Sequence, residues 1–295
     1  MKNVRTFTLS LLLIFGSIGT SKSQEIKIRG LVLDQITEQA IPYSNVGFFG
    51  ANKGTVSNIE GNFTLSINAN EVEDLKLMVS RIGYFSEELE WEDYQSSCGF
   101  DECVLTILLN PKQLELEEFV LESKNLSKRR SFGGKLSDSK FAYAFNPKDR
   151  KPKENLGREV GIIVDSKKEK FLLKELQFYL ANNQFEKALF RINIRKIGKD
   201  VNEVFETIGK EIFMEVEENA RGVFIKSFSE YEILLEGRFL ISVEWVDFES
   251  EDELGILTIP SSFPFGTMYL RNSSQDKWKK AMGNPGIRVN GLVMD

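Results

Sequence analysis

The sequence predicts an all-β protein built of two β-sandwiches, and three observations lead to this prediction. Aromatic residues are frequent, with 23 Phe and 7 Tyr among 295 residues, and such side chains favour the half-buried surface of a sheet. Apolar and polar residues alternate in many short stretches, which is the period of a strand with one buried face. Glycine, proline, asparagine and aspartate separate these stretches, as they do in antiparallel sandwiches. A chain of this length has room for two such domains.

Residues 1–23 are predicted to be a secretory signal peptide. Lys2 and Arg5 give a positively charged start, and residues 7–18 form an apolar run that small serines follow. The run is shorter than the ~20 residues of a membrane-spanning helix, and an uncleaved anchor is the alternative. We therefore expect an exported protein of the periplasm, the outer-membrane periphery or the cell surface.

The charge balance argues against nucleic acid as a partner. The formal net charge is −6, and it is −9 without residues 1–23, which hold three basic and no acidic side chains. Nucleic-acid binding needs a basic surface that releases counterions from the phosphates. The chain also has no histidine, which excludes catalytic triads and metal sites that depend on this residue.

The first domain is predicted to span residues 24–110 and to consist of short strands. Residues 25–33 show the clearest alternation, with Ile28 and Val32 on the apolar face and Arg29 on the polar one. Four further stretches have the composition of strands: residues 43–49, 63–67, 75–80 and 104–109.

The stretch GTVSNIEGNF, from Gly54 to Phe63, is predicted to form tight turns ahead of a strand. Gly54 and Gly61 bracket it, and glycine accepts the positive φ angles of such turns without steric cost. Asn58 is a turn-forming residue inside the stretch, and Phe63 begins an alternating strand. We assign these four residues to the turn that fixes a hairpin of the sandwich.

Cys98 and Cys103 are the two cysteines of the chain and lie close together in the sequence. An exported protein meets an oxidising compartment, so we predict a disulfide that closes this loop. Two free thiols are the alternative. A metal site is a poorer explanation because four ligands are normally needed and histidine is not available. No cofactor is predicted.

The order of motifs in the first domain resembles the carboxypeptidase-regulatory-like domain. The motifs are RGLVLD at residues 29–34, AIPYSNV at 40–46, GTVSN at 54–58, EGNF at 60–63 and SRIGY at 80–84. The resemblance implies a transthyretin-like sandwich of seven strands. Such domains stand at the N-termini of TonB-dependent transporters and of many exported proteins of Bacteroidota. The family often has Asp at the position of Asn58, so a role that depends on the carboxylate of this Asp is not expected in this chain.

The resemblance does not extend to the two best-known companions of this domain. A metallocarboxypeptidase needs histidine ligands, which the chain lacks. A TonB-dependent transporter needs a barrel of about 22 strands with roughly ten residues each. The sequence after Asn110 is too short for that barrel.

Residues 111–158 are predicted to be an extended basic linker. Within it, residues 122–158 hold eleven basic and four acidic side chains, a net charge of +7, and a pair of adjacent glycines. The alternative is a peripheral contact of this segment with anionic lipid head groups, lipopolysaccharide or an acidic partner. Aromatic residues such as Phe132 and Tyr143 do not fit a purely solvated linker.

The second domain, residues 159–295, is predicted to be another sandwich, of jelly-roll type. Residues 188–195 alternate apolar residues with a polar set that contains Arg191 and Arg195, and residues 239–246 repeat the pattern. Further stretches with this period are residues 172–180, 212–216, 231–235, 255–259 and 267–270.

Carboxylates are the groups left for acid–base chemistry in a chain without histidine. Glu244, with the acidic residues between 247 and 253, would supply the carboxylate pair of a glycoside hydrolase. A solvated strand edge is the structural interpretation of the same residues. The acidic run also offers oxygen ligands for Ca²⁺ but lacks the pattern of a binding loop.

The three tryptophans are candidates for a carbohydrate contact. Trp245 follows the buried pattern of its strand, so core packing is expected for it. Trp278 lies among charged residues and is the candidate for a contact surface, ahead of Trp91.

These observations favour a non-catalytic binding or scaffolding protein of the bacterial envelope. The first domain would be its interaction module, and an envelope protein or a glycan its partner. A carboxylate-based glycan hydrolase and a surface adhesin or structural protein are the two alternatives.

Overall fold

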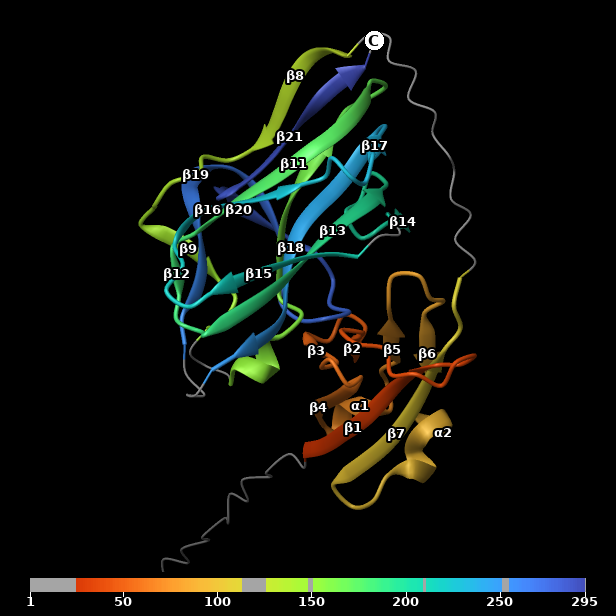
Figure 1. Ribbon diagram of the computed structural model, residues 1–295. Coiled ribbons are helices and arrows are strands. Elements are labelled where there is room, and N and C mark those ends of the chain that lie inside the picture. Colours follow the sequence, from red (N-terminus) through yellow and green to blue (C-terminus); the bar gives the residue numbers. More distant parts are fainter. Residues whose placement is uncertain (1–24, 113–125, 148–150, 209–210, 251–254, 295) are drawn as a thin grey trace, which may run out of the picture.

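The computed structural model describes residues 25–112, 126–147, 151–208, 211–250 and 255–294, so the predicted signal peptide lies outside the described residues. Figure 1 shows two bodies made mostly of strands, with the first domain below the second. No helix in this described part of the chain is long and apolar enough to cross a membrane. The prediction of an all-β fold is confirmed.

The first domain consists of two sheets around one core. One sheet has the strand order β4-β1-β7 and the other the order β3-β2-β5-β6, so that seven strands form the domain, the number that the resemblance implies. The strands are β1 (Glu25–Asp34), β2 (Asn45–Phe48), β3 (Lys53–Val56), β4 (Asn62–Asn68), β5 (Leu77–Ser80), β6 (Glu87–Leu89) and β7 (Glu102–Leu109), and the short helices are α1 (Ala69–Val72), α2 (Trp91–Tyr94) and η1 (Gln95–Ser97).

Alternation along the strands builds this core, as the sequence predicts. Ile28 and Val32 of β1 and Leu65 of β4 are buried, while Arg29 points to solvent and pairs with Glu102. One pairing differs from the antiparallel arrangement that we expected, because β1 and β7 run parallel. The chain crosses to the other sheet between these two strands, and this long crossover permits the parallel pairing.

The second domain encloses a larger core between a nine-stranded and a five-stranded sheet. The larger sheet has the order β12-β19-β10-β18-β13-β14, with β9, β15 and β20 paired to its strands, and the smaller has the order β16-β11-β21-β8, with β17 on β11. The strands are β8 (Leu126–Gly133), β9 (Phe141–Ala144), β10 (Glu159–Asp165), β11 (Lys170–Leu180), β12 (Asn182–Asn183), β13 (Lys187–Ile197), β14 (Val204–Thr207), β15 (Ile212–Glu217), β16 (Gly222–Ser227), β17 (Leu234–Leu235), β18 (Arg238–Glu249), β19 (Leu257–Arg271), β20 (Lys279–Pro285) and β21 (Ile287–Met294), and a 3-10 helix, η2, spans Pro152–Asn155.

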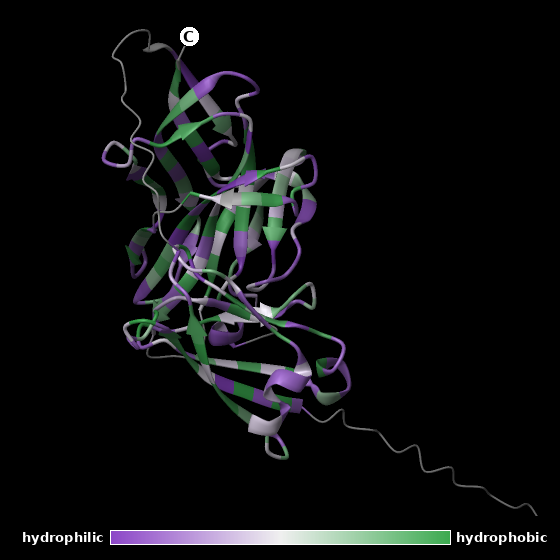
Figure 2. Ribbon diagram, turned by 90° about the vertical axis from the view of Figure 1, so that its right-hand side faces the viewer, coloured by the Kyte–Doolittle hydropathy of each residue, from purple (hydrophilic) through white to green (hydrophobic). Residues whose placement is uncertain are grey.

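Both faces of the central strands β13 and β18 are buried. Their apolar face, with Phe190 and Trp245 among its largest side chains, lies against the core of the second domain. Their polar face, which includes Arg191 and Glu244, is covered by the first domain and by the loop between β19 and β20. Figure 2 shows the alternation of hydrophilic and hydrophobic residues along the strands of both domains.

The structure differs from the expectation of a basic linker at residues 111–158. Residues 126–133 form β8, which pairs with β21, and residues 141–144 form β9, which pairs with β19. Phe132 packs on the core of the second domain, and Phe145 is fully buried in it. These aromatic side chains anchor a segment whose basic residues, such as Lys128, point to solvent.

Candidate functional site

Four charged side chains form a row across four adjacent strands of the larger sheet. The registers place Arg271 of β19 opposite Glu159 of β10, Glu159 opposite Glu244 of β18, and Glu244 opposite Arg191 of β13. Residues that face each other in a sheet point to the same side, so the row puts two carboxylates between two guanidinium groups.

The row is buried and its charges pair with each other. Glu159 and Glu244 have no exposed surface, and Arg191 is 1% exposed. Arg191 Nη2 lies 2.9 Å from Glu244 Oε2, and Arg271 Nη2 lies 2.6 Å from Glu159 Oε2 and 3.5 Å from Glu244 Oε1. Arg195 lies four residues after Arg191 on the same face of β13, and its Nη1 forms an ion pair with Glu159 Oε1 at 2.5 Å.

Neutral hydrogen-bonding groups complete the coordination of the carboxylates. Asn193 donates from Nδ2 to both glutamates, at 2.8 Å to Glu159 and 2.7 Å to Glu244. Ser242 donates its hydroxyl to Glu159 at 2.5 Å. Although burial raises the pKa of Glu159, Arg195 and Arg271 lower it to about 2. Glu159 is therefore ionised in the folded protein at neutral pH.

The first domain caps the end of this row at Arg191. Arg191 donates to the carbonyl oxygen of Tyr43 at 2.6 Å and to Asn45 Oδ1 at 2.7 Å. Arg81 donates to the same carbonyl at 3.0 Å and pairs with Glu211 of the second domain at 2.5 Å. Tyr43 has a φ angle of 54°, which is rare for an aromatic residue, and its carbonyl receives both arginines in this conformation. We call this set of contacts the domain joint.

Two glycines allow the backbones to approach at the domain joint. A Cβ atom on Gly54 would lie 2.1 Å from the carbonyl oxygen of Ser274, and one on Gly47 would lie 2.5 Å from the same oxygen. Ser274 also donates its hydroxyl to Asn45 at 3.1 Å, and Gln275 donates to Ser80 at 2.7 Å. The loop between β19 and β20 is thus seated directly on strands β2 and β3.

Gly54 therefore has a role other than the one that the sequence suggested. It lies inside β3, paired with Gly47, and its φ angle is not in the left-handed region. Gly61 has a φ angle of 77°, and Asn58 accepts the N–H of Asn62, so the turn lies between these residues. Phe63 follows in β4 and is buried in the core of the first domain.

Trp278 is not the exposed contact surface that we expected, because it is 7% exposed. The guanidinium carbon of Arg195 lies 5.5 Å from the centre of its ring, and that of Arg271 lies 5.3 Å away. The negative face of the indole offsets part of the positive charge of two buried arginines. The charged neighbours of Trp278 in the sequence concealed this arrangement.

Cys98 and Cys103 form a disulfide that closes the loop before β7. Trp91 packs edge-on against Tyr94 in the same part of the first domain. No group of three or more potential metal ligands occurs among the described residues. Part of the predicted acidic run, residues 251–254, lies outside the described residues.

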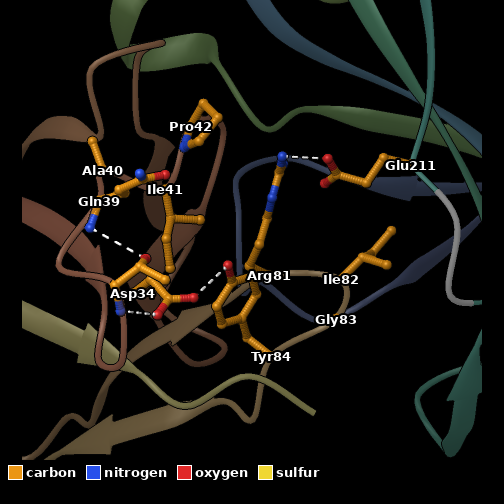
Figure 3. A pocket seen from close by; sticks show the side chains of 11 residues that line it. Asp34, Gln39, Ala40, Ile41, Pro42, Arg81, Ile82, Gly83, Tyr84 and Glu211 are labelled. Carbon is orange, nitrogen blue, oxygen red and sulfur yellow. Dashed lines mark hydrogen bonds and ion pairs between the residues drawn. The ribbon is translucent and has the colours of Figure 1, made fainter. Parts of the chain in front are cut away.

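A pocket of about 330 Å³ opens beside the domain joint (Figure 3). The Arg81-Ile82-Gly83-Tyr84 segment of the first domain and Glu211 of the second line it, together with six residues from the end of β1 and the loop before β2: Asp34, Thr37, Gln39, Ala40, Ile41 and Pro42. Three of the motifs that carry the family resemblance, RGLVLD, AIPYSNV and SRIGY, therefore meet in one cavity.

The polar groups of this pocket are positioned by hydrogen bonds (Figure 3). Tyr84 donates its hydroxyl to Asp34 Oδ2 at 3.0 Å, and the backbone N–H groups of Ile36 and Thr37 donate to Asp34 Oδ1. The bond from the N–H of Thr37 is the main cause that lowers the pKa of Asp34. Burial raises the pKa of Glu211, so this carboxyl is the weaker acid of the two.

The pocket could receive a hydrogen-bonding ligand or a partner side chain, whereas the buried row could not. Arg81 remains positively charged, although burial and the nearby Arg191 lower its pKa to about 10. It is only 9% exposed, because its guanidinium group points toward Glu211. Asp34 is as deeply buried, at 8% exposed, so it lines the floor of the pocket, whereas Tyr84 and Gln39 are more exposed.

Sequence reasoning assigned the polar residues of β13 and β18 to an outer face and missed the domain joint. One available signal was charge complementarity. Arginines alternate along β13, and glutamates occupy the corresponding face of β10 and β18. When positive and negative side chains share the polar face of adjacent strands, the pattern is consistent with a buried cluster of ion pairs and equally with a solvated surface.

Comparison with known proteins identifies the first domain. Residues 28–121 match the family model of the CarboxypepD_reg-like domain, as the motifs predicted. No curated protein matches the chain.

Two similar solved structures are both of viral particles. A structure of the T13 IBDV viral particle is similar with 10% identity and a TM-score of 0.27, covering 85% of this chain and 56% of that chain. A structure of the infectious bursal disease virus VP2 subviral particle is similar with 9% identity and a TM-score of 0.28, covering 92% of this chain and 64% of that chain. The chain thus spans less than two thirds of these chains, and scores this low carry no argument about fold or function.

Proposed function

Because residues 28–121 match the family model of the CarboxypepD_reg-like domain, we propose that the protein is a non-catalytic binding or scaffolding protein of the bacterial envelope. In this proposal the second domain holds the first in one orientation, and the pocket beside the domain joint receives the partner. The protein would reach the envelope by export, as the expected signal peptide implies. The partner would be an envelope protein or a glycan.

One observation carries the proposal: the carboxylates of Glu159 and Glu244 face the interior of the protein and are paired with buried arginines. Glu244, the carboxylate that would serve a glycan hydrolase, accepts hydrogen bonds from Arg191 and Asn193 and has no exposed surface. A general acid or base must reach its substrate within a hydrogen bond or through one water molecule. A structural joint fits this geometry better than an acid–base site.

The pocket supports the interaction role of the first domain. Its lining comes from family motifs on two loops, and loops positioned by a rigid sandwich are common places for recognition. Asp34 and Tyr84 are held by hydrogen bonds before any partner arrives, which lowers the entropy cost of binding.

Cross-linking in the native envelope tests this proposal. A photo-reactive residue introduced at Gln39, on the pocket rim, should capture a partner, and the same residue at Glu236, in the exposed loop before β18, should not. A Tyr84→Phe variant should weaken the capture, because it removes the hydroxyl that positions Asp34. Equal capture at both positions, or none at Gln39, would contradict a partner site in the pocket.

The hydrolase alternative is tested separately by turnover on a panel of envelope and dietary glycans. The proposal predicts no turnover by the pure protein. Turnover that disappears in Glu244→Gln while the variant stays folded would establish the hydrolase and reject the binding role. Protease digestion of intact cells distinguishes the adhesin alternative, because a surface protein is cut and a periplasmic one is protected.

A further inference from the structure

Strand β19 contains a bulge of four residues in the middle of its pairing with β20. Ser262 lies opposite Asn284 and Thr267 lies opposite Met282, so four residues of β19 face the single residue Gly283. The four residues are Phe263, Pro264, Phe265 and Gly266, and we call them the β19 bulge. Bulges of this kind redirect side chains and are retained as features of a fold.

The bulge displays large apolar side chains to solvent. Phe265 is 80% exposed and Phe263 is 52% exposed. Phe141 of β9, 53% exposed, lies with its ring centre 5.0 Å from that of Phe263, and Met282 of β20 is 59% exposed. Together these four side chains form the aromatic patch. Scattered exposed apolar residues need no explanation, but large apolar side chains exposed together on three paired strands mark a contact surface.

Lysines accompany the aromatic patch. Lys140 precedes Phe141, and Lys280 lies on the same face of β20 as Met282, two residues away. Lys135 follows Gly134, which lies against Asn284 beside the bulge. All three lysines are exposed. The one carboxylate in the segment between β8 and β9, Asp138, is ion-paired with Arg221.

We propose that the aromatic patch inserts into the interface of a lipid bilayer with anionic head groups. Exposed phenylalanines flanked by lysines fit such a surface, because the rings enter the boundary of the acyl chains while the ammonium groups meet the phosphates. The chain as a whole is acidic, with a net charge of −6, so this local excess of lysine is a property of the patch. The inference does not depend on the proposed function.

Two other occupants fit the patch less well. A second copy related by a two-fold axis would bring the same lysines together, which like charges oppose. A sugar needs precisely placed polar partners beside the ring, whereas the exposed tips of the patch are Phe and Met side chains. The position of the patch also allows a planar surface to approach it. In Figure 1, β9 and β19 lie at the outer side of the second domain, away from β14 at the other side of the sheet.

Vesicle co-sedimentation tests the inference. The chain from Gln24 onward contains every described residue and leaves out the apolar run at residues 7–18. This protein should sediment with vesicles of phosphatidylglycerol and phosphatidylethanolamine, and less with vesicles of phosphatidylcholine alone. A double variant, Phe263→Ser with Phe265→Ser, should bind the anionic vesicles at least about tenfold more weakly, since two apolar side chains are lost from the interface.

Matched control variants distinguish binding through the aromatic patch from non-specific binding to vesicles. Phe205 of β14 is 71% exposed at the far side of the sheet, so Phe205→Ser should bind like the wild type. Lys140→Glu with Lys280→Glu should lower binding to the anionic vesicles only. Wild-type protein that stays in the supernatant, or a phenylalanine double variant that binds as well as wild type, would overturn the inference. A dimer in lipid-free solution that the double variant abolishes would also overturn it, because a second copy would then cover the patch.

Discussion

Single residues at the domain joint are constrained by the opposite domain. Gly54 lacks a side chain because the backbone of Ser274 occupies the space that a Cβ atom would need. Tyr43 adopts a positive φ angle and directs its carbonyl to two arginines, one from each domain. Neither constraint arises from the first domain alone.

Replacing Gly54 with Ala should destabilise the folded protein by about 1–3 kcal/mol, because an added methyl group in a packed interface forces the backbone to move. The contact at 2.1 Å is with backbone, which cannot rotate away as a side chain could. Urea denaturation measures the effect. Gly99→Ala is the matched control, because its nearest atom would lie at 3.6 Å, and it should change the stability by less than about 0.5 kcal/mol. Equal effects of the two substitutions would show that the joint is looser than described.

Glu159 should contribute to stability in a pH-dependent way. Its pKa is about 2 in the folded protein against the usual 4.5, so its contribution is complete above about pH 4.5 and is lost as the pH falls toward 2. The difference corresponds to about 3 kcal/mol. At neutral pH, Glu159→Gln should cost about 3–5 kcal/mol, since two buried arginines lose their counter-charge.

Denaturation of wild type and Glu159→Gln over this pH range checks the prediction. The difference in unfolding free energy between the two proteins should shrink as the pH falls from 5 to about 2. Glu236→Gln, at an exposed position, should follow the wild type at every pH. A difference that stays constant with pH would mean that Glu159 is not ionised in the folded state.

At the scale of single strands, the sequence predicted those whose two faces differ clearly. β1 and β4 follow the expected alternation, and the buried apolar residues of β13 lie where the pattern placed them. β8 escaped detection because three consecutive basic residues dominate its composition, and one aromatic side chain, Phe132, fixes it to the core.

The polar face of β13 and β18 shows what the alternation of residues in a sequence cannot predict. Alternation separates two faces, but it does not say whether water or another domain covers the polar one. Arg191 and Glu244 look the same in sequence whether they are solvated or paired. The cover comes from residues far away in the chain, such as Tyr43 and Ser274, so only the folded arrangement reveals it.

Phe132 tests whether β8 is part of the second domain. Its ring packs edge-on against that of Phe171 at 5.3 Å, so Phe132→Ala should lower the stability by about 1–3 kcal/mol. Lys128→Ala, at an exposed position of the same strand, should leave the stability within about 0.5 kcal/mol of wild type. Thermal denaturation of both variants measures this. If Phe132→Ala left the thermal stability unchanged, the segment would be a linker and not a strand of the second domain.

At the scale of the whole molecule, the charged residues join two sandwiches into one body. The core of the second domain includes Val56 and contacts Tyr43 of the first, so apolar packing continues across the domain joint. The ion pairs and the glycine contacts then fix the orientation. A fixed orientation would keep the pocket and the aromatic patch at a constant separation, which a scaffold between a membrane and a partner requires.

Differential scanning calorimetry tests this central claim most directly. If the domain joint makes the two domains one folding unit, the protein from Gln24 onward should unfold in a single transition, with equal calorimetric and van't Hoff enthalpies. Two separate transitions in the wild-type protein, one for each sandwich, would contradict the account.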